Sequence, residues 1–240
     1  MVIDVLTSSS QGNCYKVAQD DSSFLIEVGL PLQKIKKKLG YTLSKIDFAL
    51  CSHIHFDHSK AAADILKNGI PLITSESTAA ALKLNSHNLI TFPDDNAKPI
   101  KIGSWQIVPF KLLHDVDVPC HGFLCQSLVV NETVFYASDT KILPPLSDRT
   151  AKSITHMIVE ANHSKVLVQQ NVLEGKLDKS LGIRIMRSHM AIETLVEWLE
   201  SHRFDNLQEI VLCHLSDKNS CAETIKKTIM ATMGVLVRVA

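Results

Sequence analysis

Three histidines and one aspartate lie within six residues, just after an apolar run, and this stretch constrains the fold most. It reads His53-Ile54-His55-Phe56-Asp57-His58, and the apolar run before it ends at Cys51. A run of this kind is typical of a buried strand, so the polar side chains emerge where the strand leaves the sheet. Neutral imidazole and carboxylate are ligands suited to Zn²⁺, Mn²⁺ or Fe²⁺. A histidine-rich surface turn is the alternative, and it does not explain why the cluster follows a strand.

The same pattern recurs further along the chain. Apolar runs lead directly into His114 and into His214, and another leads through Ser138 into Asp139. Because strand ends at one edge of a sheet converge in space, residues far apart in sequence can build one site there. One histidine after a strand is more often structural, but the repetition of the pattern favours a single polynuclear metal site.

Periodicity and turn residues predict an alternation of strands and helices. The strands are expected at 2–6, 14–17, 23–28, 48–51, 72–74, 105–113, 123–130, 133–137, 157–160, 210–213 and 235–239, and the helices at 32–39, 59–68, 77–84, 190–202 and 222–233. This order fits an α/β layered protein with two sheets packed face to face and helices outside, although composition alone does not exclude a doubly wound sheet.

Some boundaries have identifiable signals, and one segment has none. Gly69 is expected to stop a helix, and Ser220 with Glu223 has the form of a capping box that opens the last helix. The stretch 164–187 is polar and aperiodic. It could be a lid or substrate loop, or only an ordered surface excursion, and the sequence favours neither.

Length and composition narrow the class of protein. At 240 residues the chain is expected to form one domain, 1–240. It has no apolar run long enough for a bilayer and no signal-peptide pattern, and its six cysteines form no CxxC pair. We therefore expect a reduced, cytoplasmic protein without membrane contact. Lys plus Arg equals Asp plus Glu, 25 each, which makes a long nucleic acid a less favoured partner.

These motifs resemble the metallo-β-lactamase superfamily, whose HxHxDH signature is present at residues 53–58. The resemblance covers essentially the whole chain and implies an αββα sandwich, an α/β fold of two mixed β-sheets flanked by helices. It implies that His53, His55 and His114 hold one metal ion. A second ion would be held by Asp57, His58 and His214, and Asp139 would bridge both. Zn²⁺ is the expected metal and Mn²⁺ the alternative, because both accept these ligands.

Narrower similarities point to a phosphodiesterase branch. The stretch 8–15 resembles the opening of the YycJ-like branch, also called WalJ-like, and 160–163 resembles the EANH motif of that branch. His189, expected just before the helix 190–202, is similar to the histidine that tRNase Z relatives place before their last metal ligand. Such a residue can protonate a leaving oxygen. Ser188, with 214–220, is similar to phage-encoded anti-Pycsar phosphodiesterases.

The resemblance implies a dinuclear phosphodiesterase that hydrolyses small nucleotides, in particular 3′,5′-cyclic ones such as cCMP and cUMP. Divalent ions lower the pKa of water from about 15.7 toward ~7, which makes a nucleophile available at neutral pH. Asp57 is expected to orient the attacking water as well as to ligate, and His189 to act as the general acid. Substrate contacts are expected from Asn162, His163 and Ser188, with a supporting structural role as the alternative for Asn162 and His163.

Four readings of function remain open at this point. The first is a phosphodiesterase of small nucleotides, in particular cyclic ones, which in a phage would remove a cyclic-nucleotide signal. The second is a nuclease, either a YycJ-like exonuclease or a tRNA 3′-processing enzyme. An inactive nucleotide-binding module and a hydrolase of thioesters or lactams are the others. A small nucleotide is the expected ligand, and a homodimer the expected assembly.

Overall fold

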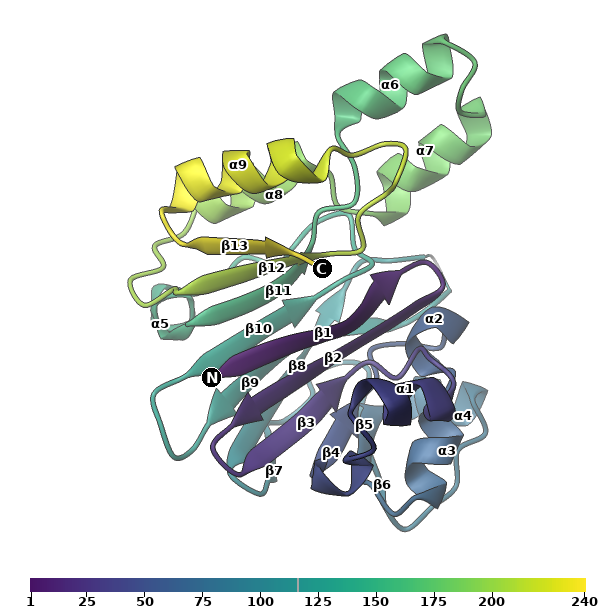
Figure 1. The fold of residues 1–240 in the computed structure, drawn as a ribbon, viewed down its shortest axis with the longest axis vertical. Helices are drawn as coiled ribbons and strands as arrows, with labels where there is room; N and C mark the ends of the chain where they lie inside the picture. Colours follow the sequence, from purple (N-terminus) through teal and green to yellow (C-terminus); the bar gives the residue numbers. More distant parts are fainter. Residues whose placement is uncertain (116) are drawn as a thin grey trace.

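Two mixed β-sheets lie face to face in the computed structural model, which describes residues 1–115 and 117–240 (Figure 1). The first sheet has six strands in the order β1-β2-β3-β4-β5-β6. Its strands are β1 (Val2–Ser9), β2 (Gly12–Gln19), β3 (Ser22–Ile26), β4 (Phe48–Leu50), β5 (Leu72–Ser75) and β6 (Leu89–Phe92). The first three pair antiparallel, and β3 to β6 pair parallel.

The second sheet has seven strands in the order β13-β12-β11-β10-β9-β8-β7. They are β7 (Ile100–Ile102), β8 (Trp105–Leu112), β9 (Cys120–Ser127), β10 (Thr133–Ala137), β11 (His156–Glu160), β12 (Glu209–Cys213) and β13 (Leu236–Val239). Strands β7 to β10 pair antiparallel, whereas β10 to β13 pair parallel. Every residue of β10, β11 and β12 is buried, which explains their continuous apolar character.

Helices cover the outer faces of both sheets (Figure 1). Besides the short 3₁₀ turn Leu43–Lys45, they are α1 (Leu32–Lys38), α2 (Phe56–Ser59), α3 (Ala62–Lys67), α4 (Glu76–Ala81), α5 (Asp148–Ser153), α6 (Lys165–Leu173), α7 (Lys179–Ser188), α8 (Ile192–Glu200) and α9 (Ala222–Met233). The helices α1 to α4 lie against the first sheet, and α8 and α9 lie against the second. The hairpin of α6 and α7 projects from the body of the molecule.

Three apolar clusters hold these layers together. The central one lies between the sheets and includes the fully buried Phe24, Trp105 and Tyr136. The other two lie between each sheet and its helices. Aromatic packing contributes to the central cluster, where the rings of Phe24 and Trp105 meet edge to face with centroids 4.8 Å apart. The αββα sandwich implied by the sequence is therefore confirmed.

Several local predictions were wrong. The strands β6 and β7 and the helices α2, α5, α6 and α7 were missed. The stretch 164–187, left open between a substrate loop and an ordered surface excursion, forms most of the α6–α7 hairpin. Helix α9 begins at the predicted residue, but its N-cap is Cys221 and no side chain caps it, so Ser220 and Glu223 form no capping box. The hydroxyl of Ser220 instead donates to the carbonyl of Ser216, at 2.7 Å.

His189 also lies differently from its prediction. It is the C-cap of α7, and helix α8 begins only at Ile192, with Ala191 as N-cap. The residue therefore does not sit at a helix start. The stop predicted near Gly69 is confirmed, since α3 ends at Lys67 and Gly69 has a φ of +79°. Among the described residues, no helix has both the length and the apolarity that crossing a bilayer requires.

Candidate metal centre

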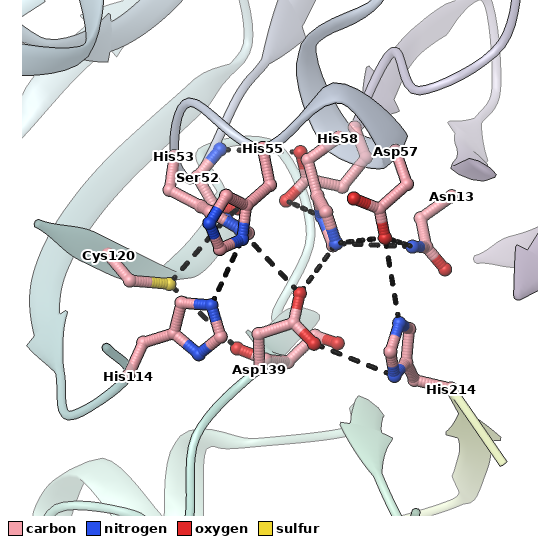
Figure 2. Close-up of polar contacts among 12 residues, drawn as sticks. Asn13, Ser52, His53, His55, Asp57, His58, His114, Cys120, Asp139 and His214 are labelled. Atoms are coloured by element: carbon pink, nitrogen blue, oxygen red, sulfur yellow. Dashed lines mark hydrogen bonds and ion pairs between the residues drawn. The ribbon is translucent and has the colours of Figure 1, made fainter. Parts of the chain in front are cut away.

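Seven side chains converge at one edge of the sandwich, each delivered by the end of a strand or by the turn after it (Figure 2). His53 and His55 follow β4, and Asp57 and His58 lie on the single turn of α2. The three remaining residues follow β8, β10 and β12; they are His114, Asp139 and His214. The structure thus brings together all seven residues that the resemblance implied as metal ligands.

The first group of possible ligands is His53, His55 and His114, which have ligand atoms within 4.8 Å of one another. Nε2 of His114 lies 3.1 Å from Nδ1 of His55. The hydroxyl of Ser52 lies 2.8 Å from Nδ1 of His53, which leaves Nε2 of His53 as the nitrogen available to an ion. This arrangement follows a general rule, since the second ring nitrogen of a metal-binding histidine is normally hydrogen-bonded.

The second group is Asp57, His58, Asp139 and His214, again with ligand atoms within 4.8 Å of one another. One oxygen of Asp139 lies 2.6 Å from Nε2 of His58 and 3.7 Å from Nε2 of His53. Asp139 therefore faces both groups, as a bridging ligand would. The carboxylate of Asp57 lies 3.4 Å from Nε2 of His58 and 3.7 Å from Nε2 of His214.

Buried polar atoms without partners show that these residues fit metal ions. Nε2 of His53, Nε2 of His214 and Oδ1 of Asp139 are buried and make no hydrogen bond within the described chain. Buried polar atoms are nearly always paired, so three such atoms without a partner in one cluster of possible ligands are unusual. All three are atoms that coordinate divalent cations, and the set of five imidazoles and two carboxylates suits Zn²⁺ or Mn²⁺.

Backbone strain accompanies two of the ligands. Asp139 and His214 have φ values of 52° and 57°, in the left-handed region that side-chain-bearing residues rarely adopt. Such conformations cost on the order of 1–3 kcal/mol each and cluster at functional sites. Around them, Nδ2 of Asn162 donates to the carbonyl of His214 at 2.7 Å, and the hydroxyl of Ser8 accepts from its N–H at 2.9 Å.

Glu27 is a buried carboxylate beneath the centre that the sequence analysis missed. Its Oε1 accepts from the hydroxyl of Tyr136 at 2.9 Å and lies 3.4 Å from Nδ1 of His58. Its other oxygen accepts from the N–H of Ser52 at 3.3 Å. Glu27 follows the apolar strand β3, so the signal that marked His114 could have found it. On the other side of His58, Nδ2 of Asn13 lies 3.1 Å from Nε2.

Glu160 is a second missed carboxylate, and it holds His189. Its Oε1 lies 2.7 Å from Nδ1 of His189 and 3.3 Å from Nδ1 of His214. Its other oxygen accepts from the N–H of Thr140 at 3.1 Å. Because the carboxylate takes Nδ1, Nε2 of His189 is left for a substrate. Glu160 opens the EANH-like stretch, and it too stands at a strand end, so the same signal could have marked it.

The carboxylates dominate the electrostatics of the centre. Burial raises the pKa of Asp57 and of Asp139, but the neighbouring His58 and His214 lower both to well below the usual range. Burial lowers the pKa of His58 and His214, but the carboxylates around each ring together outweigh it. Asp139, Glu27 and Asp57 raise the pKa of His58, and Asp139, Asp57 and Glu160 raise that of His214 to about 10. The buried carboxylates thus favour positive charge at the centre, as a cation-binding site requires. Ligation needs neutral imidazole, so an ion that binds displaces these protons.

The residues expected to contact substrate have mixed surroundings. Ser188 lines a cavity beside His114, although its hydroxyl already donates to the carbonyl of Arg184 at 2.9 Å. His163 is 1 % exposed, and its backbone pairs with Ala191. Asn162 supports His214, as described above. Their roles toward a substrate stay predictions.

The fold and ligand set agree with a comparison against protein families. A model described as the beta-lactamase superfamily domain matches residues 24–214, well over half of the chain and all seven candidate ligands. The chain belongs to the beta-lactamase superfamily. The match begins in β3 and ends at His214, so it contains the strand ends that build the centre.

A curated relative extends the likeness over most of the chain. The exodeoxyribonuclease WalJ of Streptococcus pneumoniae is 24% identical over 241 aligned residues, covering 94% of this chain and 86% of WalJ. This agrees with the similarity to YycJ-like members. None of the matches described here is an anti-Pycsar enzyme, so that narrower identity stays a prediction.

Solved structures share the fold at lower identity. The metallo-beta-lactamase fold protein YhfI from Bacillus subtilis has a TM-score of 0.73 at 18% identity and covers 99% of this chain and 95% of its own. The short form of human tRNase Z has a TM-score of 0.65 at 12% identity, with coverage of 99% and 95%. A diphosphatase of the PhnP family has a TM-score of 0.66 at 16% identity, with coverage of 99% and 94%. These likenesses establish the fold alone.

Proposed function

We propose that this superfamily hydrolase is a dinuclear metal-dependent phosphodiesterase that acts on nucleotides. The observation that carries the proposal is the position of His189, whose Nδ1 is held 2.7 Å from Glu160 beside the two ligand groups. A thioesterase or lactamase has less use for a proton donor at this place. Bound ions would supply a nucleophile from water at neutral pH and offset the negative charge on the phosphoryl oxygens in the transition state.

The chain's own residues divide the remaining work. Asp57 is 24 % exposed at its side chain, unlike the deeply buried Asp139, so it can accept a hydrogen bond from an attacking water and orient it. Nε2 of His189 can hold a proton for the departing sugar oxygen, because Glu160 fixes the ring through the other nitrogen. His189 is 22 % exposed at its side chain, which leaves it accessible to substrate.

Two substrates follow from different observations. A 3′,5′-cyclic nucleotide such as cCMP or cUMP is supported by the sequence similarity to anti-Pycsar enzymes and by the zero formal charge of the chain. In that case the protein would remove a cyclic-nucleotide signal, as a phage counter-defence would require. The end of a DNA strand is supported by the likeness to the exodeoxyribonuclease WalJ.

A substrate panel with two kinds of leaving group tests the proposal. The purified protein, with its metal content measured, is assayed on cyclic mononucleotides, cyclic dinucleotides, single-stranded DNA and bis(p-nitrophenyl) phosphate. We expect turnover of at least one natural phosphodiester. The variant His189→Ala should lose about 10²–10⁴-fold in rate on that substrate. It should lose far less on the nitrophenyl ester, because nitrophenolate leaves without a proton.

His87→Ala is the matched control, since His87 is exposed and outside the centre. It should keep full activity on every substrate. Equal losses for His189→Ala on both kinds of leaving group would argue against a proton donor. Hydrolysis of a thioester or lactam, with no phosphodiester turned over by the metal-loaded protein, would refute the proposed function.

A further inference from the structure

A cavity of about 440 Å³ opens beside the metal centre and is not explained by it. Its wall includes His114 and Asp115, from the loop after β8, and Lys141, from the loop after β10. The opposite wall is formed by α7, the second helix of the projecting hairpin. The volume lies within the range of about 300–1,000 Å³ that is typical of small-molecule sites.

The side chains of this cavity carry a local excess of positive charge. Three cationic side chains line the cavity, those of Lys141, Arg184 and Arg187, but only one carboxylate, that of Asp115. None of the lysine and arginine ion pairs within the described ranges involves these three cations. The chain as a whole has zero formal charge, so this excess of positive charge is local to the cavity. Unpaired arginines beside a candidate phosphodiester site are suited to phosphate, which they can bind through two parallel hydrogen bonds.

Arg184 and Arg187 lie on the helix that leads to the proposed proton donor, His189. Residues 180, 183, 184, 187 and 188 all line the cavity, a spacing that places them on one face of α7. The helix ends at Ser188, and the next residue is His189. Arg187 therefore stands two residues before the proposed proton donor. Arg184 lies about 5 Å further along the helix axis, at a rise of about 1.5 Å per residue.

We propose that Lys141, Arg184 and Arg187 bind a second phosphate group, next to the one that is cleaved, and that the substrate is a single-stranded oligonucleotide. This inference rests on the proposed function and decides between its two substrates. A cyclic mononucleotide has one phosphate, which the metal centre would engage, and it would leave the three cations unused. An oligonucleotide cleaved at its end places a further phosphate on the inner side of the scissile bond, next to the phosphate that is cleaved.

The test compares substrates that have one phosphate with substrates that have several. The double variant Arg184→Gln/Arg187→Gln is assayed on a single-stranded DNA oligonucleotide, on cyclic CMP and on bis(p-nitrophenyl) phosphate. We expect KM for the oligonucleotide to rise on the order of tenfold or more, with the two single-phosphate compounds unaffected. The dependence of log affinity on log salt should become shallower by about 0.7 for each phosphate that no longer has a cationic partner. Arg149→Gln, an exposed arginine on α5, is the control and should change nothing.

A binding readout separates this proposal from the proposed function. Affinity for a fluorescein-labelled oligonucleotide is measured by anisotropy in the His189→Ala background, with and without the two arginine substitutions. Weaker binding in the arginine variant supports the subsite even if no phosphodiester is hydrolysed, in which case the proposed function fails alone. Unchanged oligonucleotide affinity, or equal losses on all three substrates, overturns the subsite. Preferred turnover of a nucleoside diphosphate over the oligonucleotide overturns its assignment to oligonucleotides.

Discussion

Gly29 is the position at which the smallest substitution should do the most damage to the centre. A Cβ atom placed there would lie 1.6 Å from the carbonyl oxygen of Asp57 and 2.8 Å from the backbone nitrogen of Asn13. The backbone around it is fixed by hydrogen bonds, from Val28 N–H to His58 at 2.9 Å and from Gly29 N–H to Asn13 at 2.9 Å. The extra carbon therefore cannot be accommodated by a side-chain rotation.

The size of the expected effect follows from this distance. An ordinary contact of about 3.4 Å requires the backbone at Asp57 to move by roughly 1.8 Å. Ligand geometry tolerates only about 0.5 Å, and a displacement of about 1 Å can cost on the order of 10²-fold in rate. Gly29→Ala should therefore lose at least ~10²-fold in hydrolysis and bind less than the full complement of metal. Overpacking should also lower the free energy of unfolding by about 1–3 kcal/mol.

Metal content by elemental analysis, steady-state hydrolysis and thermal unfolding would measure these effects. Gly103→Ala is the control, because Gly103 has a φ of +53° and a Cβ added to it would meet nothing within 4 Å. It should lose about 1–2 kcal/mol from left-handed strain and keep its metal and its activity. Wild-type metal content and rate in Gly29→Ala would contradict this reasoning. They would show that Asp57 is not positioned by the close contact between α2 and the segment after β3.

Three further outcomes are expected. Glu160→Gln should retain folding but lose about 10–100-fold in hydrolysis, measured on the preferred substrate, because His189 loses its charged partner. Asp139→Asn should reduce the number of bound ions per chain, measured by elemental analysis of gel-filtered protein; unchanged stoichiometry would argue against a bridge. In the folded protein only Cys221 should react quickly with a thiol reagent such as DTNB. It is exposed, and hydrogen bonds from Thr224 lower its pKa, whereas burial raises the pKa of Cys14 and protects it.

The central strands and the metal-type ligands could be predicted because they share one signal. The strand predicted at 133–137 is β10, and the one predicted at 157–160 is β11 without its first residue. Both are buried on two faces, so their apolar runs are continuous and their ends are sharp. Polar residues just after such a run, as Ser138 and Asp139 are, are conspicuous in sequence. The weaker strands β6 and β7 are partly exposed, and they gave no such run.

The supporting carboxylates were harder to identify, for a physical reason. Glu27 and Glu160 are only 0% and 1% exposed, whereas glutamate is normally a surface residue. Each stands at or just after a strand end, but that position alone does not distinguish a buried supporting glutamate from an exposed one. Their burial is tolerable because each is surrounded by imidazoles and N–H or O–H donors from distant segments. Those partners are assembled only by the tertiary fold.

Net charge says little about the substrate, because the tertiary fold also decides where the charges gather. Lys141 and Arg187 are far apart in sequence and are separated by α5, β11 and α6, so no run of charged residues indicates that they share a cavity. A chain with 25 basic and 25 acidic residues can therefore still have a cavity wall that is locally basic. Helix α7 was not predicted because its hairpin projects from the body and buries little apolar surface. The same helix nevertheless places Arg184 and Arg187 in one cavity with His114. Neutrality of the whole chain is thus no reason to reject a polynucleotide substrate, and the choice between cyclic nucleotide and oligonucleotide depends on the wall that α7 builds.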